Sequence, residues 1–79
     1  MAELTIDDAL KLGLEALKAG RYQDADRYYT LILQSFPEHP EANYRIGSIA
    51  IELGHIDKSI PYFKKAIKNR KSEIKFWVS

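Results

Sequence analysis

The sequence repeats itself at an offset of 34 residues, and this internal repeat limits the fold more than any other feature of the chain. Four identities appear at that offset, namely Gly13/Gly47, Ala16/Ala50, Gly20/Gly54 and Tyr28/Tyr62. Further pairs are similar in size or charge: Asp7/Glu41, Lys11/Arg45, Leu12/Ile46, Leu17/Ile51, Ala25/Ser59, Tyr29/Phe63 and Leu33/Ile67. Because small residues match small residues and aromatic residues match aromatic ones, the chain is predicted to contain two copies of one structural unit.

Each copy is predicted to be a pair of antiparallel helices joined by a short turn. In the first unit, Thr5 is a candidate N-cap for a helix that stops at Gly20. A second helix is expected over residues 22–35, and it ends before Pro37 because proline disfavours helix in the residue that precedes it.

The second unit is expected to follow the same plan. Its first helix begins at Pro40, a residue suited to the first helical position, and ends at Gly54. Its second helix is expected from about Asp57 to Asn69, with Pro61 near the first turn. A further helix is expected to open at Glu73, so the sequence predicts four helices and part of a fifth, without strands.

Composition excludes several classes of protein. The chain has 79 residues and no cysteine, so it forms one domain at most and has no disulfide, thiolate zinc site or cysteine nucleophile. No apolar run approaches the roughly 20 residues that a membrane helix needs. The first residues lack the basic and then apolar profile of a signal peptide. The expected location is therefore the cytoplasm, with no membrane contact.

The charge is unevenly placed along the chain. Residues 1–61 hold 6 basic and 10 acidic side chains, whereas residues 62–79 hold 6 basic and 1 acidic. The basic residues of this second part are Lys64, Lys65, Lys68, Arg70, Lys71 and Lys75. A solvated helix face is the favoured interpretation, and a contact surface for an acidic partner is the alternative.

No constellation of residues in the sequence points to catalysis. The two histidines, His39 and His55, each lie in a predicted turn without a second ligand three or four residues away. The four glycines are scattered singly and form no phosphate-binding loop. The chain is therefore predicted not to be an enzyme, with no catalytic residue, cofactor or metal ion.

The order of these residues resembles the tetratricopeptide repeat family, whose signature is a bulky residue, Leu-Gly, and then an alanine, an aromatic residue and a proline. The first unit matches it with Leu12-Gly13, Gly20-Arg21-Tyr22, Ala25, Tyr29 and Pro37. The second matches it with Ile46-Gly47, Gly54, Phe63 and Ala66. The departures are Ala9 and Asn43 in place of the usual opening aromatic residue, Ser59 in place of the usual alanine, and Arg70-Lys71 where the first unit has Phe36-Pro37. They are expected to loosen individual contacts, and the last of them weakens the signal for a turn after the fourth helix.

The resemblance implies an all-α fold in which antiparallel helix-turn-helix repeats form a short right-handed α-solenoid. It divides the chain into a lead-in at residues 1–5, a first repeat at 6–39, a second at 40–73 and the truncated first helix of a third at 74–79. Trp77 stands 34 residues after Asn43, where a third unit would place its opening aromatic residue, so the chain is expected to be cut inside a repeat. The mid-helix Gly13 and Gly47 are expected to allow close approach of a neighbouring helix.

In this family the first helix of each unit lines a concave surface that holds peptides or partner helices. Carried over to this sequence, the partner-binding residues are predicted to be Leu10, Leu14, Leu17, Tyr44, Ser48, Ile51 and Lys75, with the charged Asp7, Lys18, Glu41 and Glu52 beside them. The carboxylate clamp of the chaperone-tail receptors is rejected, because only Lys75 agrees with it. An apolar peptide or an amphipathic helix is the expected ligand.

Two other functions remain open at this point. The chain could self-assemble at high concentration through open repeat ends, using Phe63, Ile67, Phe76 and Trp77. It could also be the accessory region of a larger enzyme. Nucleic acid is not favoured as a partner, because the period is 34 and the aromatic residues near the basic cluster have structural explanations.

Overall fold

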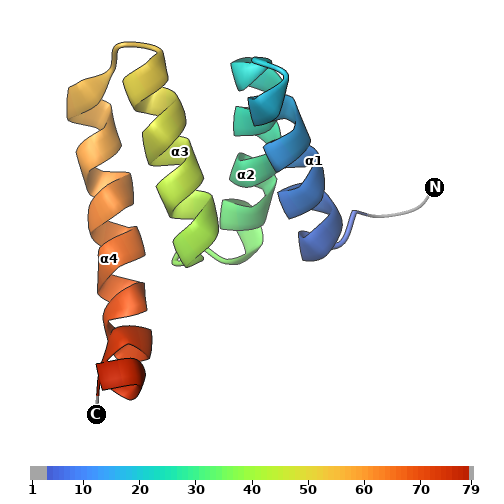
Figure 1. The fold of residues 1–79 in the computed structure, drawn as a ribbon. Helices are drawn as coiled ribbons and strands as arrows, with labels where there is room; N and C mark the ends of the chain where they lie inside the picture. The colour runs from blue at the N-terminus through green and yellow to red at the C-terminus, as the bar shows by residue number, and fades with distance from the viewer. Residues whose placement is uncertain (1–3, 79) are drawn as a thin grey trace.

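The chain folds into four helices that lie side by side in chain order, each antiparallel to the one before it (Figure 1). The computed structural model describes the backbone of residues 4–78 and the side chains of residues 4–68. The helices are α1 (Ile6–Lys18), α2 (Tyr22–Ser35), α3 (Pro40–Glu52) and α4 (Ile56–Val78), and residues 4–78 contain no strand. The predicted all-α, two-unit solenoid is confirmed.

Local signals at both ends of α1 act as the sequence predicted. The Thr5 hydroxyl accepts a hydrogen bond from the Asp8 amide at 3.0 Å, and the Asp8 carboxylate accepts one from the Thr5 amide at 3.4 Å. Gly20 follows the helix with a φ of 77°, and Gly54 follows α3 with a φ of 83°. Because only glycine adopts this left-handed conformation without strain, both units turn from their first helix to their second at the same place.

The turn between the two units is held by His39 and Asn43. The Nδ1 atom of His39 accepts a hydrogen bond from the Ala42 amide at 3.2 Å, so His39 caps α3, and Pro40 occupies the first turn. Asn43 is fully buried, and its Nδ2 atom donates to the carbonyls of Pro37 at 3.1 Å and His39 at 2.9 Å. The expectation that Asn43 loosens its contacts is therefore wrong, since its amide ties the turn to α3.

The last helix is longer than the sequence predicted. A break was expected after Asn69, with a partial fifth helix opening at Glu73, but α4 is one continuous helix. The physical reason is that Arg70-Lys71 stand where the first unit has Phe36-Pro37, so no proline or glycine interrupts the helix after Asn69, and Pro61 lies inside it. The side chains of Lys75, Phe76 and Trp77 lie outside the described residues, and the repeat boundary at residue 73 remains a prediction.

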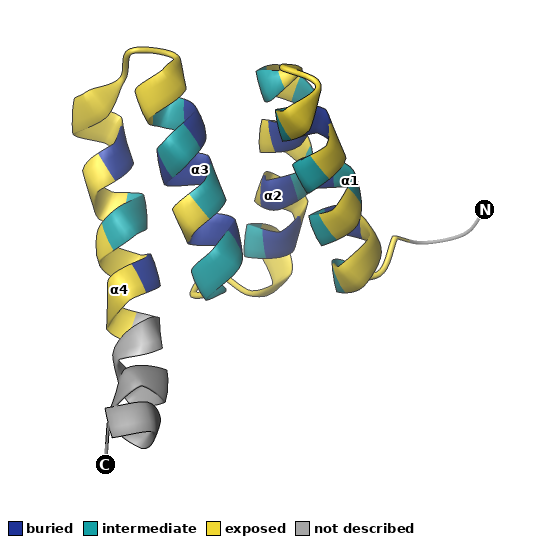
Figure 2. Cartoon of the chain, in the orientation of Figure 1, coloured by how far each residue is buried: buried dark blue, intermediate teal, exposed yellow. Residues whose placement is uncertain are grey.

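One hydrophobic core joins α1, α2 and α3, and the partly buried Tyr62 of α4 packs against it. Its buried members are Ala9, Ala16, Ala25, Tyr29, Ile32, Ala42, Ile46 and Ile49. Figure 2 shows buried residues on each of the four helices. Within each unit, the two helices meet at a mid-helix glycine: a β-carbon on Gly13 would lie 2.8 Å from the Tyr29 ring, and one on Gly47 would lie 2.9 Å from the Phe63 ring. The predicted close approach at both glycines is confirmed.

Candidate protein-interaction surfaces

Six described residues of the predicted partner-binding set lie at matching positions of the two first helices, α1 and α3, and we call them the first-helix strip. The strip consists of Leu10, Leu14, Leu17, Tyr44, Ser48 and Ile51. Ala9 and Ala16 are buried on the neighbouring side of α1, and Leu10 and Leu17 are partly buried and pack against the core. All three leucines are half-buried.

The part of the strip on α3 is more exposed than the part on α1. Tyr44 is 45% exposed and Ile51 is 46% exposed, whereas their equivalents in the first unit are half-buried. Ser48 is half-buried, and its hydroxyl donates to the Tyr44 carbonyl at 3.0 Å. Its proton is therefore used inside the helix, and the apolar neighbours provide the contact area.

Arg45 borders the strip and limits the rotation of Tyr44. Its guanidinium lies 5.5 Å from the centre of the Tyr44 ring, within the range of a cation–π contact. Its Nε atom lies 3.8 Å from a carboxylate oxygen of Glu41. On its other side the Tyr44 ring meets Phe63 of α4, with ring centres 5.9 Å apart and planes tilted by 57°.

Through Phe63 the first-helix strip continues onto α4. Ile56, Ile60, Phe63 and Ile67 recur at helical spacing on one side of α4, and we call these four residues the α4 stripe. Ile56 is 64% exposed and Ile67 is 61% exposed, whereas Phe63 is half-buried because it packs on Gly47 and Tyr44. Of the residues predicted for self-association, the structure brings Phe63 and Ile67 together, while Phe76 and Trp77 lie outside the described side chains.

Sequence reasoning did not single out Ile56 and Leu53, which lie at and just before the start of α4. Both are exposed, Leu53 by half its surface. The spacing of residues 56, 60, 63 and 67 was the available signal for Ile56, since apolar residues at steps of four, three and four make one stripe on a helix.

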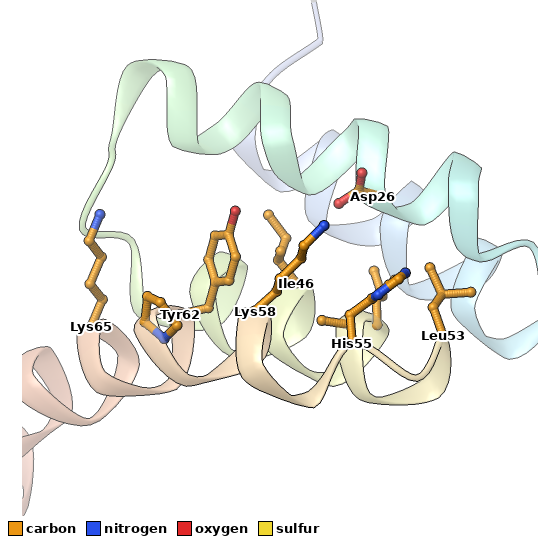
Figure 3. A pocket seen from close by; sticks show the side chains of 10 residues that line it. Asp26, Ile46, Leu53, His55, Lys58, Tyr62 and Lys65 are labelled. Atoms are coloured by element: carbon orange, nitrogen blue, oxygen red, sulfur yellow. The ribbon is translucent and has the colours of Figure 1, made fainter.

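A cleft of about 540 Å³ lies elsewhere, between α2 and α4 (Figure 3). Its apolar lining consists of Ile46, Ile49, Ala50, Leu53 and Pro61, and its polar lining consists of Asp26, His55, Lys58, Tyr62 and Lys65. In Figure 3 the ends of Lys58 and Tyr62 point toward α2, where Asp26 lies. Two further clefts lie at the start of α1 and beside the first turn. No residue of the first-helix strip lines any of these three clefts.

Two titratable groups are perturbed by their surroundings. Burial raises the pKa of the Tyr29 phenol; the Arg45 guanidinium lowers it and Glu41 raises it. Burial also raises the pKa of the Asp26 carboxyl. Neither group belongs to a metal site, since the described residues hold no cluster of three or more histidine and carboxylate side chains that could bind an ion.

Comparison with known proteins identifies the repeat. A family model for the tetratricopeptide repeat matches residues 10–74. No curated protein and no solved structure matches the chain in the corresponding comparisons. Over the part of the chain that the structure describes, no helix combines the length and the apolar character needed to cross a membrane. Since the match spans most of both two-helix units, the chain belongs to the tetratricopeptide repeat family.

Proposed function

We propose that this chain is a protein-interaction module that binds the apolar face of an amphipathic helix along the first-helix strip. Tetratricopeptide repeats generally mediate protein–protein interactions. The observation that supports this particular surface is the exposure of Tyr44 and Ile51, each by nearly half, at the positions that match Leu10 and Leu17 of α1. Exposed apolar residues gathered on one face are typical of interaction sites.

A helix suits this surface better than a charged peptide end. The strip offers apolar side chains on two adjacent first helices, which fits anchors spaced at three, four and seven residues on a ligand helix. The charges beside it are mixed, with Asp7 and Lys18 on α1 and the acidic Glu41 and Glu52 on α3. Mixed charges fix the register of a ligand and offer no concentrated positive site for a carboxylate.

A screen of displayed 15-residue peptides against the wild-type chain tests this proposal. We expect enriched peptides to be amphipathic and to lose at least tenfold in affinity for Leu14→Glu, because one buried leucine contact contributes about 1.5 kcal/mol or more. Leu31→Glu is the matched control, since Leu31 is 47% exposed on α2, outside the strip. Equal losses for both variants would place the binding site elsewhere.

Self-assembly through the α4 stripe is a second candidate function. The observation that favours it is the exposure of Ile56 and Ile67, both above 60%, on α4. Repeat arrays need their terminal faces covered or polar, because each unit buries its apolar surface against the next. For both functions we propose a cytoplasmic location, which agrees with the absence of cysteine. We also propose that the chain has no catalytic activity of its own.

A further inference from the structure

The outer face of the first unit is polar where the corresponding face of the second unit is apolar. On α3, Ala42 and Ile49 are buried against the first unit, at 0% and 2% exposure. The equivalent residues of α1, 34 positions earlier, are Asp8 and Glu15, and both are exposed. A further unit seated on α1 in the same manner would bury two carboxylates without partners, which is strongly unfavourable. Copies of this chain are therefore ill suited to stack head to tail.

The outward face of α4 lacks such protection. On α2, Tyr29 is fully buried, and Tyr22 and Leu33 are half-buried and pack against the core. Their equivalents on α4 are Phe63, Ile56 and Ile67, and all three are more exposed. The α4 stripe is thus the counterpart of a surface that is buried or half-buried in the first unit.

The α4 stripe has a spacing that reads the same in both directions along the helix. Its members are separated by four, three and four residues. Two copies of α4 placed antiparallel around a two-fold axis would set Ile56 opposite Ile67 and Ile60 opposite Phe63. This is the pairing of an antiparallel coiled coil, and it lets one surface serve both partners of a symmetric dimer.

Charges beside the stripe fit the same antiparallel arrangement. Asp57 and Lys64 each follow a member of the stripe by one residue, so they lie on the same edge of α4, and both are exposed. They lie on opposite sides of the stripe's midpoint, Asp57 about 4.5 residues before it and Lys64 about 2.5 residues after it. In an antiparallel pair, Asp57 of each copy would therefore come near Lys64 of the other, which gives two opposite-charge contacts.

We propose that two copies of this chain associate tail to tail through their α4 stripes, with the α4 helices antiparallel and Asp57 paired with Lys64 across the two-fold axis. This arrangement rests on the self-assembly function proposed above and adds its partner, its surface and its direction. The pairing uses α4 and no residue of α1, and Tyr44 of the first-helix strip borders the pairing surface through Phe63.

Sedimentation equilibrium of the wild-type chain, from about 1 µM to about 1 mM, tests the surface. We expect a monomer–dimer equilibrium and no larger species. Ile67→Glu should weaken dimerisation at least a hundredfold, because the two-fold symmetry places the change in the interface twice. Leu31→Glu, on α2, should leave the dimerisation constant within about twofold.

A charge exchange tests the direction of pairing. Asp57→Lys and Lys64→Asp should each weaken the homodimer about tenfold, since each turns two attractions into two repulsions. An equimolar mixture of these two variants should restore a dimer close to wild-type affinity, because both contacts become attractive again. Circular dichroism melts of each variant confirm that the fold is kept.

The outcomes separate the arrangement from the function. A wild-type chain that stays monomeric at millimolar concentration overturns both. Glu15 lies on the outer face of α1, away from the α4 stripe. If Glu15→Lys weakens the wild-type dimer and the mixture of Asp57→Lys and Lys64→Asp forms no dimer, self-assembly stands and the tail-to-tail arrangement is overturned.

Discussion

Gly13 of α1 lies directly against the ring of Tyr29 on α2, with no room for a side chain between them. A β-carbon at Gly13 would come within 2.8 Å of two ring atoms. Tyr29 is fully buried, so its ring has no free space into which to move. The second unit repeats the contact with Gly47 and Phe63, at 2.9 Å. The glycines set the distance between the helices of each unit.

We expect Gly13→Ala to lower the free energy of unfolding by about 1–3 kcal/mol, because the added methyl overpacks the contact with Tyr29. Helix propensity alone predicts the opposite sign, since alanine stabilises a helix interior by about 1 kcal/mol relative to glycine. Gly47→Ala should be destabilising by less, because Phe63 is half-buried and can shift. Urea denaturation gives the free energy of unfolding of the wild type, Gly13→Ala and Gly47→Ala. A Gly13→Ala variant more stable than the wild type would contradict the close packing.

Tyr29→Phe should raise the free energy of unfolding or leave it unchanged, with a gain of up to about 1 kcal/mol. The Tyr29 hydroxyl is buried and has no hydrogen-bond partner among the described residues. A buried donor without a partner costs free energy, and Phe63 shows that the equivalent position accepts phenylalanine. Tyr28→Phe, at a half-buried neighbour, is the control for the loss of a hydroxyl as such. A loss above 1 kcal/mol for Tyr29→Phe alone would show that its hydroxyl is bonded.

The stability of the chain should fall at alkaline pH, in part because of Tyr29. Burial raises the pKa of its phenol above the ordinary value of 10.0, so the unfolded chain loses this proton first as the pH rises. The unfolded state then binds fewer protons than the folded state, and stability falls with pH from about 10 upward. Tyr29→Phe should therefore show a shallower decline in melting temperature between about pH 9 and pH 11. If the melting temperatures of the wild type and of Tyr29→Phe declined in parallel with pH, Tyr29 would ionise equally in the folded and unfolded states.

Strong local signals made most of the helix boundaries predictable. The Thr5 cap, the left-handed Gly20 and Pro37 act within a few residues of the helix ends they define, so the sequence alone placed α1 and α2. The predicted end of the last helix at Asn69 was wrong, because it was inferred from the repeat and not from a local signal. Arg70-Lys71 contain neither proline nor glycine, and a helix without such a residue continues.

The face of each candidate residue followed from helical periodicity, but its exposure did not. Leu10 and Tyr44 occupy equivalent positions, yet Leu10 is half-buried and Tyr44 is exposed. That difference depends on which neighbours lie beside each residue in space. For the same reason the role of Asn43 was missed, since its amide reaches back to two carbonyls of the preceding turn.

Asn43→Asp should destabilise the chain by roughly 3 kcal/mol near neutral pH. The change removes the Nδ2 donor that holds the carbonyls of Pro37 and His39, and it places a buried carboxylate beside them. The deficit should shrink as the pH falls, because the protonated acid regains one donor and loses its charge. Asn43→Leu is the matched variant, with a smaller deficit that does not vary with pH. Thermal melts between about pH 3 and pH 7 distinguish the two.

The outer face of α1 is polar, and a variant that makes it apolar should change how copies of the chain associate. Asp8→Ala with Glu15→Ile gives α1 the residues that α3 buries at the equivalent positions, Ala42 and Ile49. The altered face should then bind the exposed α4 stripe of another copy, and a head-to-tail contact of this kind does not close on itself. We expect the double variant to form chains that grow with concentration, visible by light scattering, while the wild type stops at a dimer. Adding Ile67→Glu to the double variant should abolish the growth, because it removes the surface onto which each new copy docks. A double variant that stays no larger than the wild type would show that Asp8 and Glu15 are not what prevents head-to-tail stacking.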